Sequence, residues 1–214
     1  MIISRGREYL FVHIPKTGGT SMALALEDRA KADDILIGDT PKALRRKARL
    51  KGIETRGRVW KHSTLADVEE LVTRNEMQDL FVFTMVRNPW DRLVSYYHWL
   101  QVQTFENRAV ALAQQLDFSS FLNHEHTQNS LRANPAVRYV TDAAGTVHAD
   151  LYIRLDQFAQ DVKALEEHLG FDIKLPHANA SKRDAAYQSY FSDADRALVV
   201  ILCSDDIERF GFTF

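Results

Sequence analysis

The stretch YLFVHIPKTGGTSMALALE, residues 9–27, decides the fold, because it combines an apolar run, a glycine loop and a helical pattern in direct succession. The run Tyr9–Ile14 predicts a short buried strand, and a helix is expected from about Thr20 to Asp28. Between them, Gly18 and Gly19 allow the backbone to approach a ligand closely. Backbone amides at a helix start attract anions. The stretch therefore predicts an anion-binding loop between a strand and a helix.

The polar residues of this loop argue against the usual nucleotide triphosphate. The nucleotide-binding P-loop requires Gly-Lys-Ser/Thr, and the dipeptide Gly-Lys does not occur in the chain. Lys16 instead precedes the glycines and would approach an anion from the strand side. Thr17, Thr20 and Ser21 add hydroxyl donors. Taken alone, the loop also fits a simple glycine turn with a threonine cap.

A second loop follows LFVFTMV, residues Leu80–Val86, which is apolar on both faces and predicts a central parallel strand. Asn88-Pro89 then predicts a helix start, with asparagine as the cap. Arg87 leaves the strand end and Ser95 lies about two turns into that helix, so both can reach one phosphate. An arginine that satisfies strand-end carbonyls is the alternative interpretation.

The remaining pattern predicts an α/β fold. Further expected elements are a strand Val59–Lys61, a helix Thr64–Arg74, a strand Asp150–Leu155, a helix Asp156–His168 closed by Gly170, and a mostly helical C-terminal part. Recurring strand-loop-helix units indicate a central parallel sheet flanked by helices. Ligands of such sheets bind at the carboxyl ends of the strands, where both loops are placed. The length of 214 residues fits one domain, residues 1–214.

Composition limits the classes of function. A net charge of -2 gives no argument for a nucleic-acid partner or an anionic membrane. No apolar run approaches the roughly 20 residues of a membrane span, and no signal peptide precedes the domain, so a cytoplasmic protein is expected. Cys203, the single cysteine, lies in the apolar stretch ALVVILC and is expected to be a buried, inert thiol.

Two motifs together resemble a known family. IPKTGGTS, residues 14–21, and RNPWDRLVSYY, residues 87–97, resemble the 5′-phosphosulfate and 3′-phosphate loops of sulfotransferases that use 3′-phosphoadenosine-5′-phosphosulfate (PAPS). The likeness is greatest to the carbohydrate branch that includes the heparan sulfate 2-O-sulfotransferases and many bacterial relatives. WKHSTLADVEEL, residues 60–71, is similar to the segment that carries the family's catalytic histidine. Residues 150–171 and 175–214 resemble its later helices, although RLDQ departs from the usual Arg-Phe-Glu-Asn, so Arg154 and Asp156 are treated as structural.

The resemblance implies a P-loop-NTPase-like sulfotransferase fold and a reaction. A sulfuryl group would pass from PAPS to a hydroxyl or amine of a carbohydrate or other small acceptor, leaving adenosine 3′,5′-bisphosphate, with no metal. Lys16 and His62 are the implied catalytic residues, and His177 is a reserve base. The implied cofactor-binding residues are Lys16, Thr17, Gly18, Gly19, Thr20, Ser21, Arg87, Ser95, Ser181, Lys182 and Arg183. Of the other histidines, His98 is placed on a helix, and His124, His126, His148 and His168 are expected to be exposed.

A basic segment precedes the implied base. Residues Lys42–Lys61 contain nine basic residues and one acid, Glu54, in a chain of net charge -2. Such a segment can attract an anionic acceptor such as an acidic glycan, or it can form an ordinary solvated face. No membrane-embedded or nucleic-acid partner is expected, and the sequence leaves the oligomeric state open.

Two other functions fit parts of the pattern. A small-molecule kinase with a variant phosphate loop should have a lysine after the glycines and a carboxylate at a strand end to organise magnesium. LFVFTMVRN instead ends in arginine. A non-catalytic nucleotide-binding module would need neither Lys16 nor His62.

Overall fold

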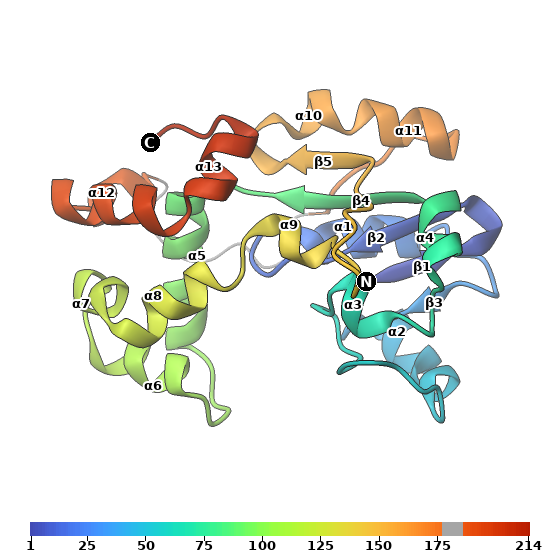
Figure 1. The fold of residues 1–214 in the computed structure, drawn as a ribbon, viewed down its shortest axis with the longest axis horizontal. Coiled ribbons are helices and arrows are strands. Elements are labelled where there is room, and N and C mark those ends of the chain that lie inside the picture. The colour runs from blue at the N-terminus through green and yellow to red at the C-terminus, as the bar shows by residue number, and fades with distance from the viewer. Residues whose placement is uncertain (177–185) are drawn as a thin grey trace. The chain divides into compact units, whose positions relative to one another are not determined.

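The computed structural model describes residues 1–176 and 186–214. The described chain divides into two compact units. The first contains residues 1–86 and 136–176 and holds the sheet, and the second contains residues 87–135 and 186–214 and is helical (Figure 1). The expectation of one domain over residues 1–214 stays a prediction.

A five-stranded sheet forms the first unit. Its spatial order is β3 (Ile35–Leu36), β1 (Ile2–Ser4), β2 (Tyr9–Val12), β4 (Phe81–Val86) and β5 (Leu151–Arg154). The strands β2, β4 and β5 are mutually parallel, so the α/β prediction with a central parallel sheet is confirmed. β1 runs antiparallel to both of its neighbours, which makes the sheet mixed. Only four residues join β1 to β2, and such a short connection permits only an antiparallel pair.

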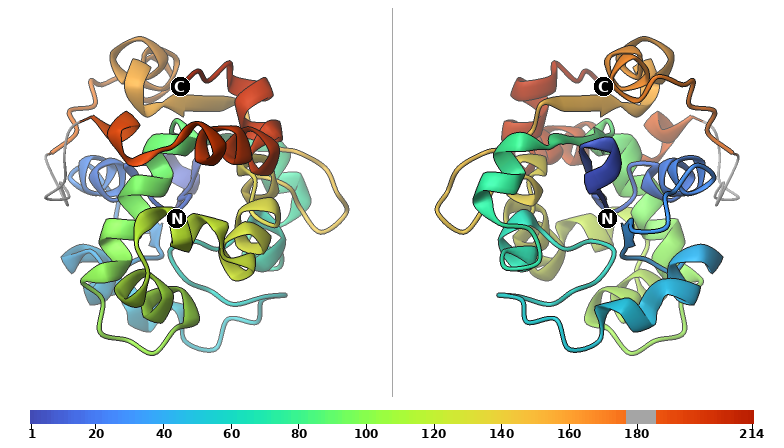
Figure 2. Two further views of the ribbon diagram at one scale, coloured as in Figure 1. Left: turned by 90° about the vertical axis from the view of Figure 1, so that its left-hand side faces the viewer. Right: turned by 90° about the vertical axis from the view of Figure 1, so that its right-hand side faces the viewer.

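Helices cover both faces of this sheet, as the two side views show (Figure 2). On one face, Phe11, Phe83 and Met85 pack into a core with side chains of α1 (Gly19–Glu27), α10 (Phe158–Asp161) and α11 (Lys163–Leu169). α3 (Leu65–Val68) and α4 (Arg74–Asp79) lie on the other side. Side chains alternate between the faces along each strand, so the helices on both sides bury an apolar surface.

The segment between Lys61 and Asp79 differs from the sequence prediction. Thr64 begins α3 through a capping box with Asp67, as predicted. The helix ends at Val68, because Glu69 adopts ψ 138° and Glu70 a left-handed φ of 88°. A second capping box, Thr73 with Glu76, then begins α4. The predicted single helix Thr64–Arg74 is therefore wrong beyond its first turn.

The predicted strand Val59–Lys61 is also wrong. The backbone there is a turn held by Ser63, which is fully buried. The Ser63 hydroxyl accepts from the Trp60 amide at 2.9 Å and lies 2.8 Å from the Arg58 carbonyl oxygen. A side chain that satisfies these backbone groups replaces the partner strand that they would otherwise need.

Helices dominate the second unit. α5 (Pro89–Gln101) begins at Asn88, whose side chain accepts from the Trp90 amide, as predicted. Leu93, Tyr97 and Leu100 line its buried side. The other described helices of this unit are α6 (Arg108–Gln115), α7 (Phe118–Asn123), α8 (Glu125–Arg132), α12 (Asp193–Leu202) and α13 (Ser204–Phe210), with a 3-10 turn Tyr187–Tyr190.

Shorter elements complete the first unit. They are α2 (Pro41–Arg46), α9 (Ala136–Tyr139) and the 3-10 turns Arg5–Arg7, Lys47–Leu50 and Leu155–Gln157. The predicted helix Asp156–His168 is a 3-10 turn followed by α10 and α11, and Gly170 ends it with a left-handed φ of 73°, as predicted. No helix among the described residues has the length and hydrophobicity to cross a membrane.

Candidate active site

The glycine loop joins β2 to α1 with two unusual backbone conformations. Lys16 has a left-handed φ of 65°, which a residue with a Cβ adopts at a cost of about 1–2 kcal/mol. Gly18 has φ 89° and caps α1. A Cβ on Gly18 would lie 3.0 Å from Cδ1 of Leu155, so both its conformation and its surroundings require glycine. Backbone strain of this kind persists where the surrounding structure enforces it, which is typical of ligand-binding loops.

The loop offers fewer donors than the sequence suggests. The Thr17 hydroxyl is buried and donates to the Ile14 carbonyl oxygen at 2.9 Å, so it closes the loop and is unavailable to an anion. The Ser21 amide donates to the Gly18 carbonyl oxygen at 3.0 Å. In this structure the Thr17 hydroxyl is used within the loop, whereas the hydroxyls of Thr20 and Ser21 stay predicted donors. The amides of Gly18, Gly19 and Thr20 precede the first intrahelical hydrogen bonds of α1 and remain the groups suited to an anion.

His13 packs directly against the loop, a contact that sequence reasoning missed. A Cβ built on Gly19 would lie 2.1 Å from Cδ2 of the His13 ring. Only a glycine therefore admits this ring over the start of α1. His13 is 5% exposed, and burial lowers its pKa well below the usual range, so its ring is neutral. His13 is the one polar residue in the apolar run Tyr9–Ile14 and lies next to the loop, and this position is the signal that could have identified it as a loop contact.

His62 is joined to this arrangement through its ring. Its Nδ1 lies 2.9 Å from the His13 carbonyl oxygen. A carbonyl oxygen can only accept, so Nδ1 carries the hydrogen and Nε2 keeps its lone pair. Burial lowers the pKa of His62 to about 4, although the hydrogen bond to His13 opposes the shift. The ring is therefore neutral at pH 7 in the tautomer that can accept a proton at Nε2.

Aromatic and cationic side chains continue from His62 toward solvent. The His13 and His62 ring centroids are 4.6 Å apart, and those of His62 and Trp60 are 4.9 Å apart in an edge-on arrangement. The guanidinium of Arg58 lies 5.1 Å from the centroid of the Trp60 ring. Trp60 is 40% exposed, whereas His13 is buried. The row of side chains thus runs from the buried loop to an exposed indole.

The second predicted loop lies at the start of α5 in the second unit. Arg87 Nε donates to Asp91 Oδ2 at 2.7 Å, and both side chains are largely buried. Asp91 and Ser95 are four residues apart on α5 and so lie on one side of the helix. The ion pair therefore orients the guanidinium on the side of α5 that carries Ser95. Arg92, in the first turn of α5, pairs with Asp206 at 3.9 Å.

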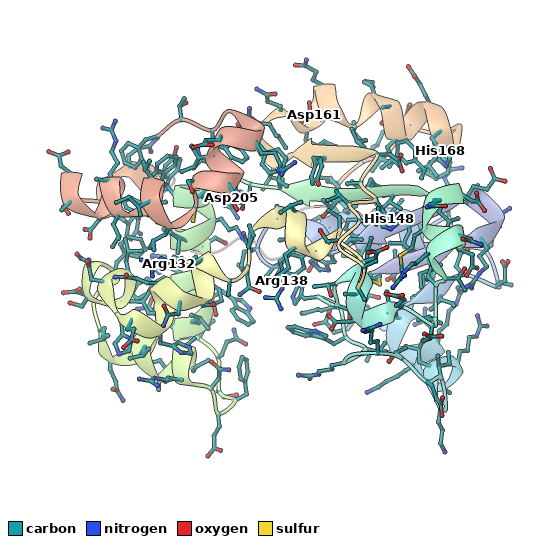
Figure 3. The ribbon with its side chains drawn as sticks, viewed as in Figure 1. Arg132, Arg138, His148, Asp161, His168 and Asp205 are labelled. Carbon is teal, nitrogen blue, oxygen red and sulfur yellow. The ribbon has the colours of Figure 1, made fainter. Side chains whose placement is uncertain are left out.

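The remaining predictions concern four residues of the C-terminal part and the other histidines. His177, Ser181, Lys182 and Arg183 lie outside the described residues. The prediction of an exposed His148 is wrong, since its side chain is 4% exposed and its Nε2 lies 2.9 Å from Oδ2 of buried Asp142. Figure 3 labels His148 and His168, which is exposed as predicted at the end of α11. His124 and His126 are half-buried, and His98 lies on α5.

The two remaining groups of interest are a cysteine and potential metal ligands. Cys203 is half-buried, and burial raises the pKa of its thiol to about 12, which keeps it protonated and unreactive. Across residues 1–176 and 186–214, no group of three or more histidine, cysteine, aspartate or glutamate side chains could hold a metal ion.

The basic segment divides into structural and exposed residues. Lys42 donates to the backbone carbonyl of Glu27, Arg46 to those of Lys31 and Asp34, and Arg49 to that of Ala32. Lys61 pairs with Asp39 at 2.5 Å. The exposed basic residues are Arg45, Lys47, Arg49, Lys51, Arg56 and Arg58, and Arg49 is exposed despite its bond to the backbone. The segment therefore presents six of its nine positive charges to solvent.

Comparisons with known proteins give the family. No curated protein sequence matches the chain. The crystal structure of mouse sulfotransferase SULT7A1 complexed with PAP is similar over 95% of this chain and 84% of that chain, with 15% sequence identity and a TM-score of 0.49. The model of the sulfotransferase family matches residues 1–213. The chain therefore belongs to the sulfotransferase family.

Proposed function

We propose that this sulfotransferase uses PAPS as the sulfuryl donor and His62 as the base. The observation that carries the proposal is the link from His62 to the glycine loop through His13. The His13 carbonyl fixes the tautomer of His62, while the His13 ring packs on Gly19. The same residue thus positions a proton acceptor and shapes the start of α1, where an anion is stabilised.

The residues present suit the 5′-phosphosulfate. PAPS supplies the sulfuryl group, whose bond to the 5′-phosphate oxygen breaks as a bond from the acceptor oxygen or nitrogen to sulfur forms. Nε2 of His62 takes the proton that the acceptor loses. Lys16 and the amides of Gly18, Gly19 and Thr20 stabilise the negative charge that the leaving phosphate gains. Protein groups in such transfers mainly position the reactants and balance charge.

The second loop is proposed to bind the 3′-phosphate. Arg87 offers a planar fork of donors and Ser95 a neutral hydroxyl. The Asp91 carboxylate accepts from Nε of Arg87 and so orients the guanidinium. Thr17 and Ser21 support the 5′ loop, Thr17 through its bond to Ile14 and Ser21 through its bond to Gly18. Ser181, Lys182 and Arg183 stay in the proposal as further contacts to the phosphates, on the resemblance alone.

The acceptor is proposed to be a carbohydrate that carries negative charge, as in the carbohydrate branch that the motifs resemble. Support comes from the exposed basic residues that precede His62 in the chain. Neutralising Arg45, Lys47, Lys51 and Arg56 together should raise the acceptor KM and leave kcat unchanged. An unchanged KM would exclude a role for this segment in acceptor binding.

Location in the cytoplasm stays a prediction from the sequence.

PAPS turnover tests the proposed base. The purified protein is incubated with PAPS and a panel of acidic and neutral oligosaccharides, and sulfated product is measured. We expect His62→Ala to lower kcat/KM at least a hundredfold, the usual contribution of general base catalysis. His168→Ala is a matched control, because His168 also lies within hydrogen-bonding distance of backbone carbonyls and stacks on an aromatic ring, Phe81. Equal rates for His62→Ala and wild type would refute the assignment.

The same preparation separates the two alternatives. A small-molecule kinase would bind ATP with magnesium in preference to adenosine 3′,5′-bisphosphate. A non-catalytic module would bind the bisphosphate and give no sulfated product with any acceptor.

A further inference from the structure

The Arg58–Trp60 pair is the most distinctive exposed feature close to His62. Trp60 is 40% exposed, while Trp90 is buried and Trp99 half-buried. An exposed indole beside the proposed base offers a flat apolar face and an N–H donor, which together suit a ligand with one apolar face and polar edges. Its contact with the ring of His62 places it next to the proton acceptor.

The turn that carries Trp60 is rigid, which makes it suitable for binding. Ser63 anchors the Trp60 amide, and the Gly57 amide donates to the Asp67 carbonyl oxygen at 2.9 Å. A Cβ on Gly57 would lie 2.2 Å from Oδ1 of Asp67, so the close approach of this turn to α3 requires glycine. The backbone before Arg58 is thus tied to Asp67 of α3, and that of Arg58 and Trp60 to Ser63. An exposed side chain on a fixed backbone loses little conformational entropy when it binds.

We propose that Trp60 and Arg58 form the acceptor platform: Trp60 stacks on the sugar ring that presents its hydroxyl to His62, and Arg58 binds a carboxylate or sulfate on that sugar. This inference rests on the proposed function and names the acceptor class as an anionic pyranose. Indole faces bind the apolar C–H faces of sugars, and a stacked guanidinium keeps its planar donors for an oxyanion. Arg56 lies two residues before Arg58 and is also exposed, so the charge of the surroundings is complementary to such a ligand.

Tryptophan fluorescence tests the platform directly. The probe is a hexuronic acid–hexosamine oligosaccharide, added to the protein saturated with adenosine 3′,5′-bisphosphate. We expect the probe to change the tryptophan emission and to reduce its quenching by acrylamide, since Trp60 is the tryptophan most open to solvent. Trp60→Phe should abolish this response. A probe that binds by calorimetry without altering the emission would overturn the inference.

Steady-state kinetics then separate the two side chains. Arg58→Ala should raise KM for the acidic oligosaccharide about tenfold and leave KM for its carboxyl-reduced form unchanged, because about 1.4 kcal/mol corresponds to tenfold in binding. Trp60→Ala should raise KM for both forms. Arg29→Ala is the matched control, since Arg29 is an exposed arginine whose guanidinium lies 4.8 Å from the Phe171 ring centroid. Equal KM values for the acidic and reduced forms in wild type would overturn the anionic class.

Binding of the bisphosphate alone distinguishes failure of this inference from failure of the proposed function. In one outcome, the protein binds adenosine 3′,5′-bisphosphate and sulfates an acceptor, and the Trp60→Ala and Arg58→Ala variants both keep the wild-type KM. The platform is then refuted and the PAPS reaction stands. If the bisphosphate does not bind, the proposed function itself fails.

Discussion

The pH dependence of turnover provides a sharp test of the His62 environment. Burial lowers the pKa of His62 to about 4 in the folded protein, against about 6.5 for a histidine in water. A base must be neutral to accept a proton, so its neutral fraction sets the acid limb of kcat/KM, which reports the free enzyme. On lowering the pH from 7.5 to 5, a base of pKa 6.5 would lose activity about 30-fold. His62 at pKa 4 would lose only about 10%.

The assay is PAPS turnover at subsaturating acceptor between pH 4 and 8. A neutral acceptor is used, so that acceptor carboxylates do not titrate in this range. We expect a flat profile down to about pH 5, and His62→Gln should lower the rate and remove the acid limb. An acid limb centred near pH 6.5 that disappears in His62→Gln would refute the buried, neutral environment described for His62.

Three further predictions concern folding and the loop. The unfolded chain protonates His62 near pH 6.5 and the native state only near pH 4, so His62 should make the free energy of unfolding rise with pH between 4 and 6.5 by up to about 3 kcal/mol. The rise should be smaller by this amount in His62→Gln, where buried His13 still contributes, and a rise of equal size in the variant and wild type would contradict the assignment. Gly19→Ala should destabilise the protein by about 1–3 kcal/mol and lower its affinity for the bisphosphate, because the added Cβ would meet the His13 ring. Thermal melts and calorimetry measure the two effects, and wild-type values in both would exclude that contact. Thr17→Val should lower the free energy of unfolding by about 1–3 kcal/mol, since it leaves the Ile14 carbonyl unpaired, whereas Thr17→Ser should be close to wild type in urea titrations.

The sequence predicted the parts of the fold that local patterns determine. Helix starts were placed correctly where a cap was visible, as at Asn88 and Thr64. The end of the helix at Val68 was missed, because Glu69 and Glu70 carry no helix-breaking signal and their conformations depend on packing. The antiparallel β1 follows from a short connection whose importance appears only once the pairing of β2 is known.

The residues of the candidate site stay a prediction from the sequence, whereas the contacts between them appear only in the structure. The motif placed His62 beside a helix start, but its link to His13 spans 49 positions in the chain. No pattern within either segment indicates that a backbone carbonyl of one fixes the tautomer of the other. Burial of the Thr17 hydroxyl and exposure of Trp60 likewise depend on tertiary packing. Sequence motifs can thus suggest candidate residues, while the protonation states of those residues require the structure.

Nucleotide binding by calorimetry tests the central claim, that the chain binds the 3′-phosphorylated donor, most directly. Wild type and Arg87→Ala are titrated with adenosine 3′,5′-bisphosphate and with ATP plus magnesium. Arg92→Ala, in the first turn of α5 just after Arg87, is the control for loss of a cation. The account predicts tight bisphosphate binding that Arg87→Ala abolishes and Arg92→Ala retains, with weak ATP binding throughout. Preference for ATP plus magnesium, or bisphosphate binding that is unchanged in Arg87→Ala, would contradict it.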